Sequence, residues 1–226
     1  MTERIPPGTV SRMAMYLRCL RDLEEQEKTI VSSRELALLL GVTPEQVRQD
    51  FLIVGCTGKC GAGYDVVRLK HRIECFFGRD AGHQTCCMVG MGNLGRALIS
   101  SEMVQDWGFR YVAAFDTDPH RIGTRFHDIP IYALSEIKTV VRREHIGIGV
   151  ITVCASWAHR AARLLRAAGI RGILNFAPEA LRTFEQTPIV SVDFSREFLK
   201  LAFYIQSAES RSQEELAQIQ AMSAGE

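Results

Sequence analysis

Apolar residues in the first third of the chain recur every three or four positions. Between residues 10 and 25, Met13, Leu17, Leu20 and Leu23 are separated by charged and polar side chains, a pattern typical of a helix with one buried face. We expect this helix to build the core of a small N-terminal domain.

Two shorter helices are predicted to follow, each with its own start signal. Ser32 can accept a hydrogen bond from the backbone while Glu35 reaches back, and Gly41 ends the apolar run, which together define a capped helix. Thr43, followed by a proline at the first helical position, opens the next helix in the same way. Two short capped helices joined by a tight turn predict a helix-turn-helix.

A glycine-rich segment, residues 55–64, comes directly after these helices. Its four glycines, a lysine and an aromatic residue predict a tight β-hairpin, in the position that the wing takes in a winged-helix domain. Asp65 is expected to cap a helix that runs through Phe77. We place the winged-helix domain at residues 1–79.

From residue 85 the pattern changes to short apolar strands that alternate with helical stretches. Strands are predicted at 85–89, 111–115, 147–154, 172–176 and 189–192, with helices at 93–103, 135–144 and 156–168. This alternation predicts an α/β fold with a doubly wound parallel sheet, which we assign to residues 80–192.

Composition narrows the functional classes. The formal net charge of +1 excludes a basic field over the whole chain, so nucleic-acid binding requires a local surface. No segment reaches 18 apolar residues and the N-terminus has no signal-peptide pattern, so we expect a cytoplasmic protein with no membrane partner. The seven scattered cysteines indicate reduced thiols. No metal site is assigned, because nothing near Cys56 and Cys60 completes a zinc set; thiol sensing and incidental cysteines both stay open for that pair.

The strongest chemical signal is the run Gly90-Met91-Gly92-Asn93-Leu94-Gly95. It follows an apolar strand and opens a helix, the context in which G-x-G-x-x-G binds a dinucleotide. Gly90 permits the sharp turn, Gly92 lets a pyrophosphate approach the backbone, and Gly95 lets the helix pack closely on the strand. The free N–H groups of the helix N-terminus would face the phosphates.

Asp116 lies at the end of the second predicted strand, 21 residues after Gly95. Its carboxylate can accept hydrogen bonds from both ribose hydroxyls and would repel a 2′-phosphate, which favours NAD(H) over NADP(H). The alternative is a structural glycine turn followed by a surface aspartate.

The rest of the chain favours a sensor over an enzyme. The predicted strands account for most of the residues after 85, so no separate substrate domain remains. His159 is expected at the surface and Cys154 in the core as a small hydrophobe, and no catalytic residue is assigned. A small NAD-dependent dehydrogenase and a DNA-binding protein with a purely structural Rossmann domain remain as alternatives.

These features resemble the Rex family of redox-sensing transcriptional repressors. The matching segments extend from about residue 5 to 205 and are IPPGTVSRMAMYLRCL, VSSRELA, VRQDF, GKCGAGY, VGMGNLG, FDTDP, GILNFAP and VDF. The resemblance implies a homodimer that binds double-stranded operator DNA and is released by NADH, whereas NAD+ competes poorly. It also implies a C-terminal helix, residues 193–208, swapped between protomers and followed by a polar tail, residues 209–226.

The resemblance assigns DNA contacts to the helix-turn-helix and the wing. These residues are Ser32, Ser33, Arg48, Gln49, Lys59, Gly61, Gly63 and Tyr64. Gln49 stands where family members commonly have a second basic residue. Asp50 is expected to orient a neighbouring arginine, because phosphate would repel it. Solvated surface charge is the alternative for Arg48 and Lys59.

At the nucleotide site the resemblance adds residues near the nicotinamide and a route to the DNA-binding domain. Asn175, Phe176 and Pro178 are placed on the nicotinamide side, with Phe194 as its shield. Arg18 and Asp193 are expected to pair and to couple the two domains. Where many members carry a tyrosine after the first Rossmann helix, this chain has Ser100-Ser101-Glu102.

The final helix carries an apolar stripe of Phe198, Leu201, Ala202 and Ile205. Such a stripe is typical of burial. Exchange between protomers and burial within its own chain both explain it at this stage.

Overall fold

The structure is a computed structural model that describes residues 5–58, 63–78, 84–101, 103–184 and 186–207. The chain divides into two compact units, Met1–His83 and Gln84–Glu226, close to the boundary predicted after residue 79. The first unit holds the predicted helix-turn-helix and the second holds the predicted parallel sheet.

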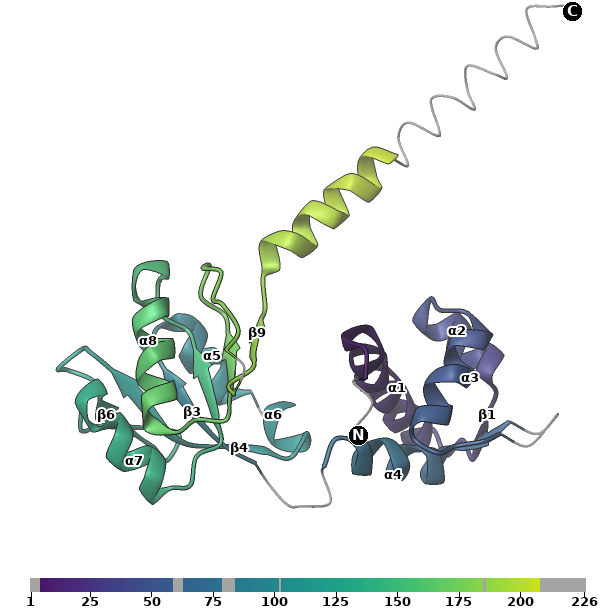
Figure 1. The fold of residues 1–226 in the computed structure, drawn as a ribbon, viewed down its shortest axis with the longest axis horizontal. Helices are drawn as coiled ribbons and strands as arrows, with labels where there is room; N and C mark the ends of the chain where they lie inside the picture. The colour runs from purple at the N-terminus through teal and green to yellow at the C-terminus, as the bar shows by residue number, and fades with distance from the viewer. Residues whose placement is uncertain (1–4, 59–62, 79–83, 102, 185, 208–226) are drawn as a thin grey trace, which may run out of the picture. The chain divides into compact units, whose positions relative to one another are not determined.

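Helices dominate the first unit (Figure 1). In chain order its elements are α1 (Pro7–Glu25), β1 (Ile30–Val31), α2 (Ser33–Leu40), α3 (Pro44–Ile53), β2 (Tyr64–Asp65) and α4 (Val66–Phe76). The predicted caps are present: the Ser32 hydroxyl accepts the N–H of Glu35 at 3.1 Å, and the Thr43 hydroxyl accepts that of Gln46 at 3.2 Å. The helix-turn-helix of α2 and α3 is confirmed.

The core of this unit is built on the apolar face of α1. Met13, Tyr16, Leu17 and Leu20 are at most 2 % exposed, and burial of each such side chain contributes about 1.5–3 kcal/mol. Tyr16 packs edge-on against Phe51 of α3, with ring centroids 4.9 Å apart. The helical spacing in the sequence therefore identified the buried face of α1.

The strand at the end of the glycine-rich segment pairs with a partner that the sequence did not predict. Tyr64 pairs with Val31 and Asp65 with Ile30, so β2 lies antiparallel to the strand that precedes α2. Gly63 adopts φ +82°, and a Cβ there would lie 2.6 Å from the carbonyl oxygen of Val31. Only glycine fits where the two strands meet. A hairpin confined to residues 55–64 is therefore the wrong pairing for Tyr64, and residues 59–62 lie outside the described ranges.

The second unit is a seven-stranded sheet. Its strands are β3 (Gln84–Val89), β4 (Phe109–Asp116), β5 (Arg125–Phe126), β6 (Ile129–Ala133), β7 (Ile148–Ile151), β8 (Gly172–Asn175) and β9 (Ile189–Ser191). Their order is β5-β6-β4-β3-β7-β8-β9, and all pairings are parallel except that of β5 with β6. The predicted doubly wound sheet is confirmed. The strand order reverses between β3 and β7, where folds of this class bind ligands.

Helices cover both faces of this sheet. They are α5 (Asn93–Ser100), α6 (Met103–Asp106), α7 (Ile137–Arg143) and α8 (Ala155–Ala168), with a 3-10 turn, η2, at Leu134–Glu136. The α7 and α8 side chains pack with Cys87, Val89 and Phe115 on one face, and Ile99 of α5 packs with Met88 on the other. The predicted helix over 93–103 ends at Ser100, and β5 and β6 were not predicted.

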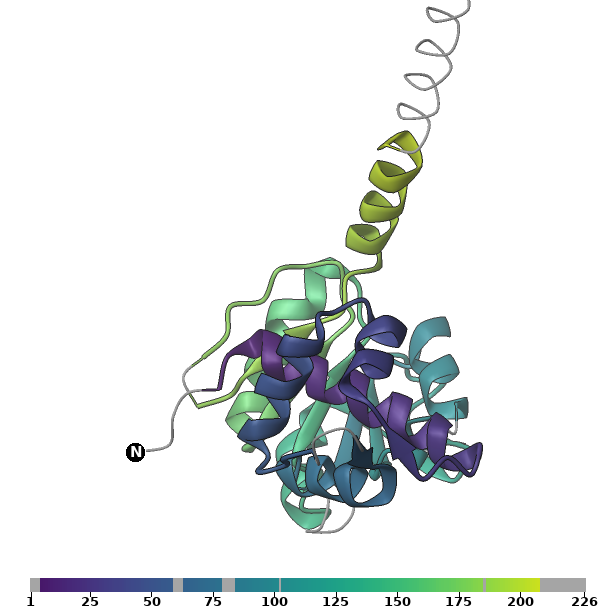
Figure 2. The same cartoon turned by 90° about the vertical axis from the view of Figure 1, so that its right-hand side faces the viewer.

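A further helix spans residues 194–207. Both views of the ribbon show that it adds no layer to the sheet (Figures 1 and 2). Phe198, Leu201 and Ile205 of the predicted stripe are 72 %, 54 % and 52 % exposed, so burial within its own chain is not what the structure shows. No helix in the described ranges has both the length and the apolar character needed to span a bilayer.

Candidate functional site

The turn from β3 into α5 requires glycine at two of its positions. Gly90 adopts φ +100°, and a Cβ there would lie 2.9 Å from Val153 Cγ1. A Cβ on Gly95 would lie 2.2 Å from the carbonyl oxygen of Gly90. These distances are below van der Waals contact, so any larger residue would push α5 away from the end of β3.

Gly92 differs from these two glycines because the space beside it is open. No atom lies within 4 Å of the position that its Cβ would take. Gly92 is the N-cap of α5, and because glycine has no side chain, no side-chain cap covers the first N–H groups of the helix. The first N–H groups of α5, with exposed Asn93 and Leu94, are therefore available to an anion that approaches the backbone.

Asp116, at the end of β4, lies beside this turn and is 8 % exposed. Its Oδ2 accepts the N–H of Met91 at 2.8 Å, and its Oδ1 accepts those of Thr117 at 2.7 Å and Asp118 at 2.9 Å. Arg121 donates to Oδ2 at 3.1 Å. Burial alone would raise the pKa of this carboxyl, but these donors outweigh it and hold the pKa below its ordinary value. Asp116 is therefore an ionised acceptor.

Met91 was predicted to bind the cofactor, but its described contacts are with the protein. Its side chain is 1 % exposed and packs in the core with Met88 and Ile99. Because its N–H donates to Asp116, Met91 fixes the carboxylate relative to the glycine turn.

Thr152 is a site residue that the sequence did not identify. It follows β7, and its hydroxyl donates to the carbonyl oxygen of Gly90 at 2.7 Å. This bond ties the glycine turn to the neighbouring strand. The available signal was its position at the end of an apolar strand, which many residues share.

Asn175, predicted on the nicotinamide side, is fully buried and makes its hydrogen bonds within the chain. Its Nδ2 donates to the carbonyl oxygens of Ala177 at 3.3 Å and Glu179 at 3.0 Å and to the Ser191 hydroxyl at 3.3 Å, and its Oδ1 accepts the N–H of Ala177 at 3.0 Å. Its amide therefore shapes the loop after β8, and its contact with a nicotinamide stays a prediction.

The aromatic residues expected at this end do come together. The rings of Phe176 and Phe194 stack with centroids 6.3 Å apart. Pro178 is exposed, and Phe194 is 55 % exposed. An apolar face is thus present at the carboxyl end of β8, which can cover an aromatic ring of a ligand.

Cys154 and His159 were considered as catalytic candidates. Cys154 is exposed as the N-cap of α8, so the prediction that it lies in the core is wrong. The strand was predicted to run through residue 154, but β7 ends at Ile151 and the chain turns outward. His159 is at the surface as predicted, with its Nε2 3.4 Å from a carboxylate oxygen of Glu179.

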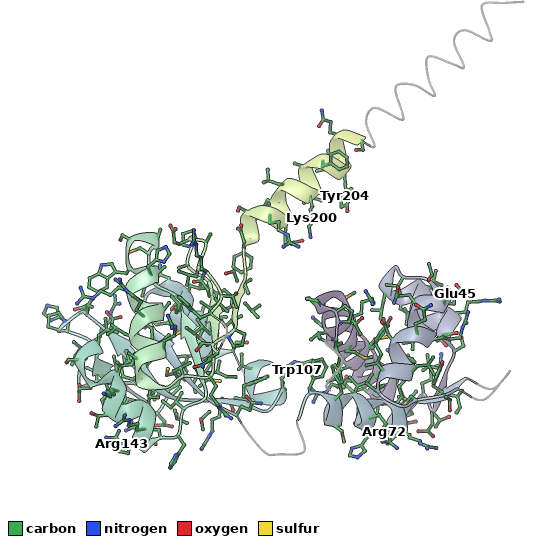
Figure 3. The ribbon with its side chains drawn as sticks, in the orientation of Figure 1. Glu45, Arg72, Trp107, Arg143, Lys200 and Tyr204 are labelled. Atoms are coloured by element: carbon green, nitrogen blue, oxygen red, sulfur yellow. The ribbon has the colours of Figure 1, made fainter. Side chains whose placement is uncertain are left out.

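The expected DNA-reading helix, α3, presents Arg48 and Gln49 on its exposed face. The Arg48 guanidinium donates to the Ser33 hydroxyl at 3.0 Å and pairs with Glu45. The Ser32 hydroxyl accepts the N–H of Glu35 as the cap of α2, and the Ser33 hydroxyl accepts from Arg48, so the O–H of each serine can still donate. Figure 3 labels Glu45, which lies in the first turn of α3.

Tyr64 packs against the base of α3, which limits its role as a DNA contact. Its ring meets Phe51 edge-on with centroids 5.0 Å apart, and it is only partly exposed. Gly63 is required by the strand pairing described above. Lys59 and Gly61, the other predicted wing contacts, lie outside the described residues.

Asp50 holds α3 to α1 through a network that the sequence did not reveal. It is 1 % exposed and accepts from Arg12 at 2.6 and 2.8 Å, from the Tyr16 hydroxyl at 3.0 Å and from Gln46 at 3.2 Å. Burial opposes ionisation, but these donors hold the pKa of Asp50 below its ordinary value. Asp50 does hold an arginine, as expected, but that arginine is Arg12 of α1 and not a neighbour in the sequence.

The two residues of the predicted coupling pair belong to different units. Arg18 is exposed on α1. Asp193 is exposed and accepts the N–H of Ser195 at 3.0 Å, as a cap of the helix of residues 194–207. Their pairing stays a prediction. Within the described residues, no group of three or more His, Cys, Asp or Glu side chains is placed to hold a metal ion.

Two family descriptions match the chain. The family "Putative DNA-binding protein N-terminus" matches residues 4–51, and "CoA binding domain" matches residues 82–179. These matches fall on the helix-turn-helix unit and on the parallel sheet respectively.

Relatives match almost the whole chain. A protein of Solidesulfovibrio magneticus called redox-sensing transcriptional repressor Rex is 36 % identical over 204 residues, which cover 90 % of this chain and 92 % of that protein. A protein of Streptomyces coelicolor with the same name is 38 % identical over 202 residues, covering 89 % and 78 % of the two chains.

Solved structures show the same architecture. The crystal structure of RSP, a Rex-family repressor, superposes with a TM-score of 0.85 at 26 % identity, covering 94 % of this chain and 99 % of that one. RSP in complex with β-NAD+ and operator DNA gives a TM-score of 0.84 at 27 % identity, covering 94 % and 97 % of the two chains. RSP in complex with β-NADH gives 0.83 at 26 %, covering 92 % and 98 %.

Proposed function

The chain belongs to the Rex family of transcriptional repressors, and on that premise we propose that it represses genes by binding operator DNA and leaves the DNA when NADH fills the site beside Gly92. NADH and NAD+ act as competing effectors that report the redox ratio. A chromosomal target also supports a cytoplasmic location.

One observation carries the effector site: an open helix N-terminus lies next to an ionised carboxylate. Space beside Gly92 admits a pyrophosphate to the first N–H groups of α5. Asp116 is tied to the same turn through Met91 and provides the acceptor that an adenosine ribose needs. A glycine turn with a purely structural role would not need the empty space at Gly92.

The DNA-binding surface is α3 with the N-terminal end of α2. Arg48 and Gln49 are exposed on α3, and a recognition helix of this kind reads base edges in the major groove. Arg48 is held by Ser33, so its guanidinium lies at the junction of the two helices. Arginine in such a position binds guanine through two hydrogen bonds or pairs with phosphate.

The dinucleotide is proposed as an effector and not as a substrate. The polar residue at the end of β8, Asn175, is buried and makes its hydrogen bonds to the adjacent loop and to Ser191. The side chains that meet at this end are the stacked Phe176 and Phe194. Phenyl rings shield a nicotinamide from water but transfer no protons.

A homodimer is supported by two apolar surfaces in the second unit. The helix of residues 194–207 exposes Phe198, Leu199, Phe203 and Tyr204 by 63–72 %, and Figure 3 labels Tyr204 and Lys200 on it. The sheet face bears an apolar hollow of about 460 Å³, whose lining residues include Trp107, Tyr111, Val150, Leu174 and Val190. We propose that the helix of one protomer covers the hollow of its partner.

The helix exchange is tested by Phe198→Glu, measured by light scattering after size exclusion. The variant should run as a monomer and lose operator affinity, since one recognition helix makes half the contacts. Lys200→Glu on the same helix is the matched control and should remain dimeric. A dimeric Phe198→Glu protein contradicts the exchange.

The proposed function is tested by titrating fluorescent operator DNA with the protein at fixed NADH or NAD+. NADH should weaken operator binding and NAD+ should not. In Gly92→Asp a carboxylate would occupy the phosphate position, so NADH should lose its effect while operator affinity persists. If the operator is bound equally well with and without saturating NADH, the chain is not a redox sensor.

A further inference from the structure

Beside Asp116 lies a cation that the glycine turn does not require. Arg121 follows β4, and its Nη1 lies 3.1 Å from Asp116 Oδ2 while its Nε lies 3.2 Å from Asp118 Oδ2. Its side chain is 41 % exposed, compared with 10 % for Asp116. One guanidinium thus bridges two carboxylates and reaches into solvent at the ribose end of the site.

Asp116 does not need Arg121 to stay in place. Three of its donors are the backbone N–H groups of Met91, Thr117 and Asp118, at 2.7–2.9 Å. Backbone donors are fixed by the fold, whereas Arg121 is held by rotatable bonds and makes the longest of the four contacts. Its contribution should therefore be to the ligand and not to the position of Asp116.

Dinucleotide-binding domains use these two residue types for opposite purposes. An acidic residue at the end of this strand accepts the ribose 2′-hydroxyl, whereas a nearby arginine accommodates a 2′-phosphate. Here both occur in one hydrogen-bonded group. We infer that Arg121 is a specificity-determining residue that offsets the repulsion of Asp116 for a 2′-phosphate, so that NADPH is a second, weaker ligand of this site. The inference rests on the dinucleotide site proposed above.

The geometry allows Arg121 to change partners without leaving the site. When a ribose hydroxyl donates to Asp116 Oδ2, Nη1 is displaced while Nε keeps its contact with Asp118. Both terminal nitrogens would then be free to donate to phosphate oxygens, which the planar guanidinium fork suits. Two carboxylates and one guanidinium leave a net negative charge, so NADH remains the preferred ligand.

Arg121→Met tests this directly, because it removes the cation and keeps an unbranched, flexible stem at that position. Dissociation constants for NADH and NADPH are measured on the full chain by calorimetry. The Kd for NADPH should rise about tenfold, equivalent to about 1.4 kcal/mol, and that for NADH less than about threefold. Arg125→Met is the matched control: this exposed arginine donates to the carbonyl oxygen of Asp128 and should leave both constants unchanged.

A second variant checks the sign of the effect. Asp116→Asn removes the repulsion, so the preference for NADH over NADPH should shrink, and adding Arg121→Met should restore part of it.

Two results overturn the inference. Equal losses of affinity for both dinucleotides in Arg121→Met would show that Arg121 only supports Asp116. An unchanged NADPH affinity in that variant would show that Arg121 does not contact the 2′-phosphate. If the wild-type protein binds NADH but the variants give one of these results, only the inference about Arg121 is wrong. If the wild-type protein binds neither dinucleotide, the proposed function is wrong as well.

Discussion

Asp50 illustrates how one buried carboxylate can control the position of a helix, here α3, which is proposed to read DNA. Its contacts with Arg12, Tyr16 and Gln46 connect α1 to α3. Asp50→Ala should therefore destabilise the first unit by about 3 kcal/mol, because it leaves a cation and a hydroxyl without their partner. The free energy of unfolding is measured by urea titration. Glu45→Gln, at a site 70 % exposed on the same helix, is the control and should change it by less than about 0.5 kcal/mol.

The same residue predicts a pH dependence with a definite sign. Its pKa is lower in the folded protein than the ordinary value of 3.8, so its contribution is complete above about pH 4 and is lost as pH falls through the folded pKa. The stability gap between wild type and Asp50→Ala should stay constant from pH 7 to 5 and narrow below pH 4. A gap that already narrows near pH 6 would contradict this assignment.

Local spacing revealed the glycine turn and Asp116, but not the residues whose roles depend on distant partners. Arg12 and Asp50 are 38 positions apart, and no periodicity connects them. Asn175 differs, since two of its three partners, Ala177 and Glu179, lie within four positions of it in the chain, and its place at the nicotinamide stays a prediction. A polar residue at the end of a strand is therefore a weak signal until its hydrogen bonds are known.

At the scale of elements, the long periodic segments were predicted well and the two-residue strands were not. α1 and α8 show several turns of helical spacing, whereas β1, β2 and β5 have two residues each and carry no measurable period. β6 was missed because its sequence, IPIYA, contains a proline and does not alternate between apolar and polar residues. These short strands matter, since β1 and β2 fix the base of the predicted wing.

The start of α8 leads to a prediction about chemical reactivity. Cys154 is exposed at this N-cap, next to Val153, whose side chain adjoins Gly90. A bound dinucleotide should cover it, so saturating NADH should slow its alkylation by iodoacetamide severalfold, measured by mass spectrometry.

Two other classes of thiol serve as internal controls for that experiment. Cys75 is exposed on α4 and should react at the same rate with and without NADH. Cys86 is buried, and burial raises its pKa to about 12, so it should stay unmodified in the folded protein. Equal slowing at Cys75 and Cys154 would indicate a general stiffening and not coverage of the site.

At the scale of the whole molecule, sequence and structure agree on two domains, one mainly helical and one built on a parallel sheet. The coupling between NADH binding and operator binding has to be measured. If bound NADH raises the Kd for the operator by a given factor, here called the coupling factor, linkage requires the operator to raise the Kd for NADH by the same factor. We expect Arg18 and Asp193 to carry part of this coupling. Arg18→Ala and Asp193→Asn should each bring this coupling factor, measured as the ratio of the operator Kd with and without NADH, closer to one. The affinity for NADH in the absence of DNA should change little.

A double-mutant cycle decides whether these two residues act as a pair. Asparagine still caps a helix, so Asp193→Asn should preserve the contact with Ser195 and change only the charge. If the pair carries the coupling, the double variant should lose no more than either single variant, because the second change removes an interaction that is already gone. Losses that add in full would mean that the two residues act separately and that no Arg18–Asp193 pair carries the coupling.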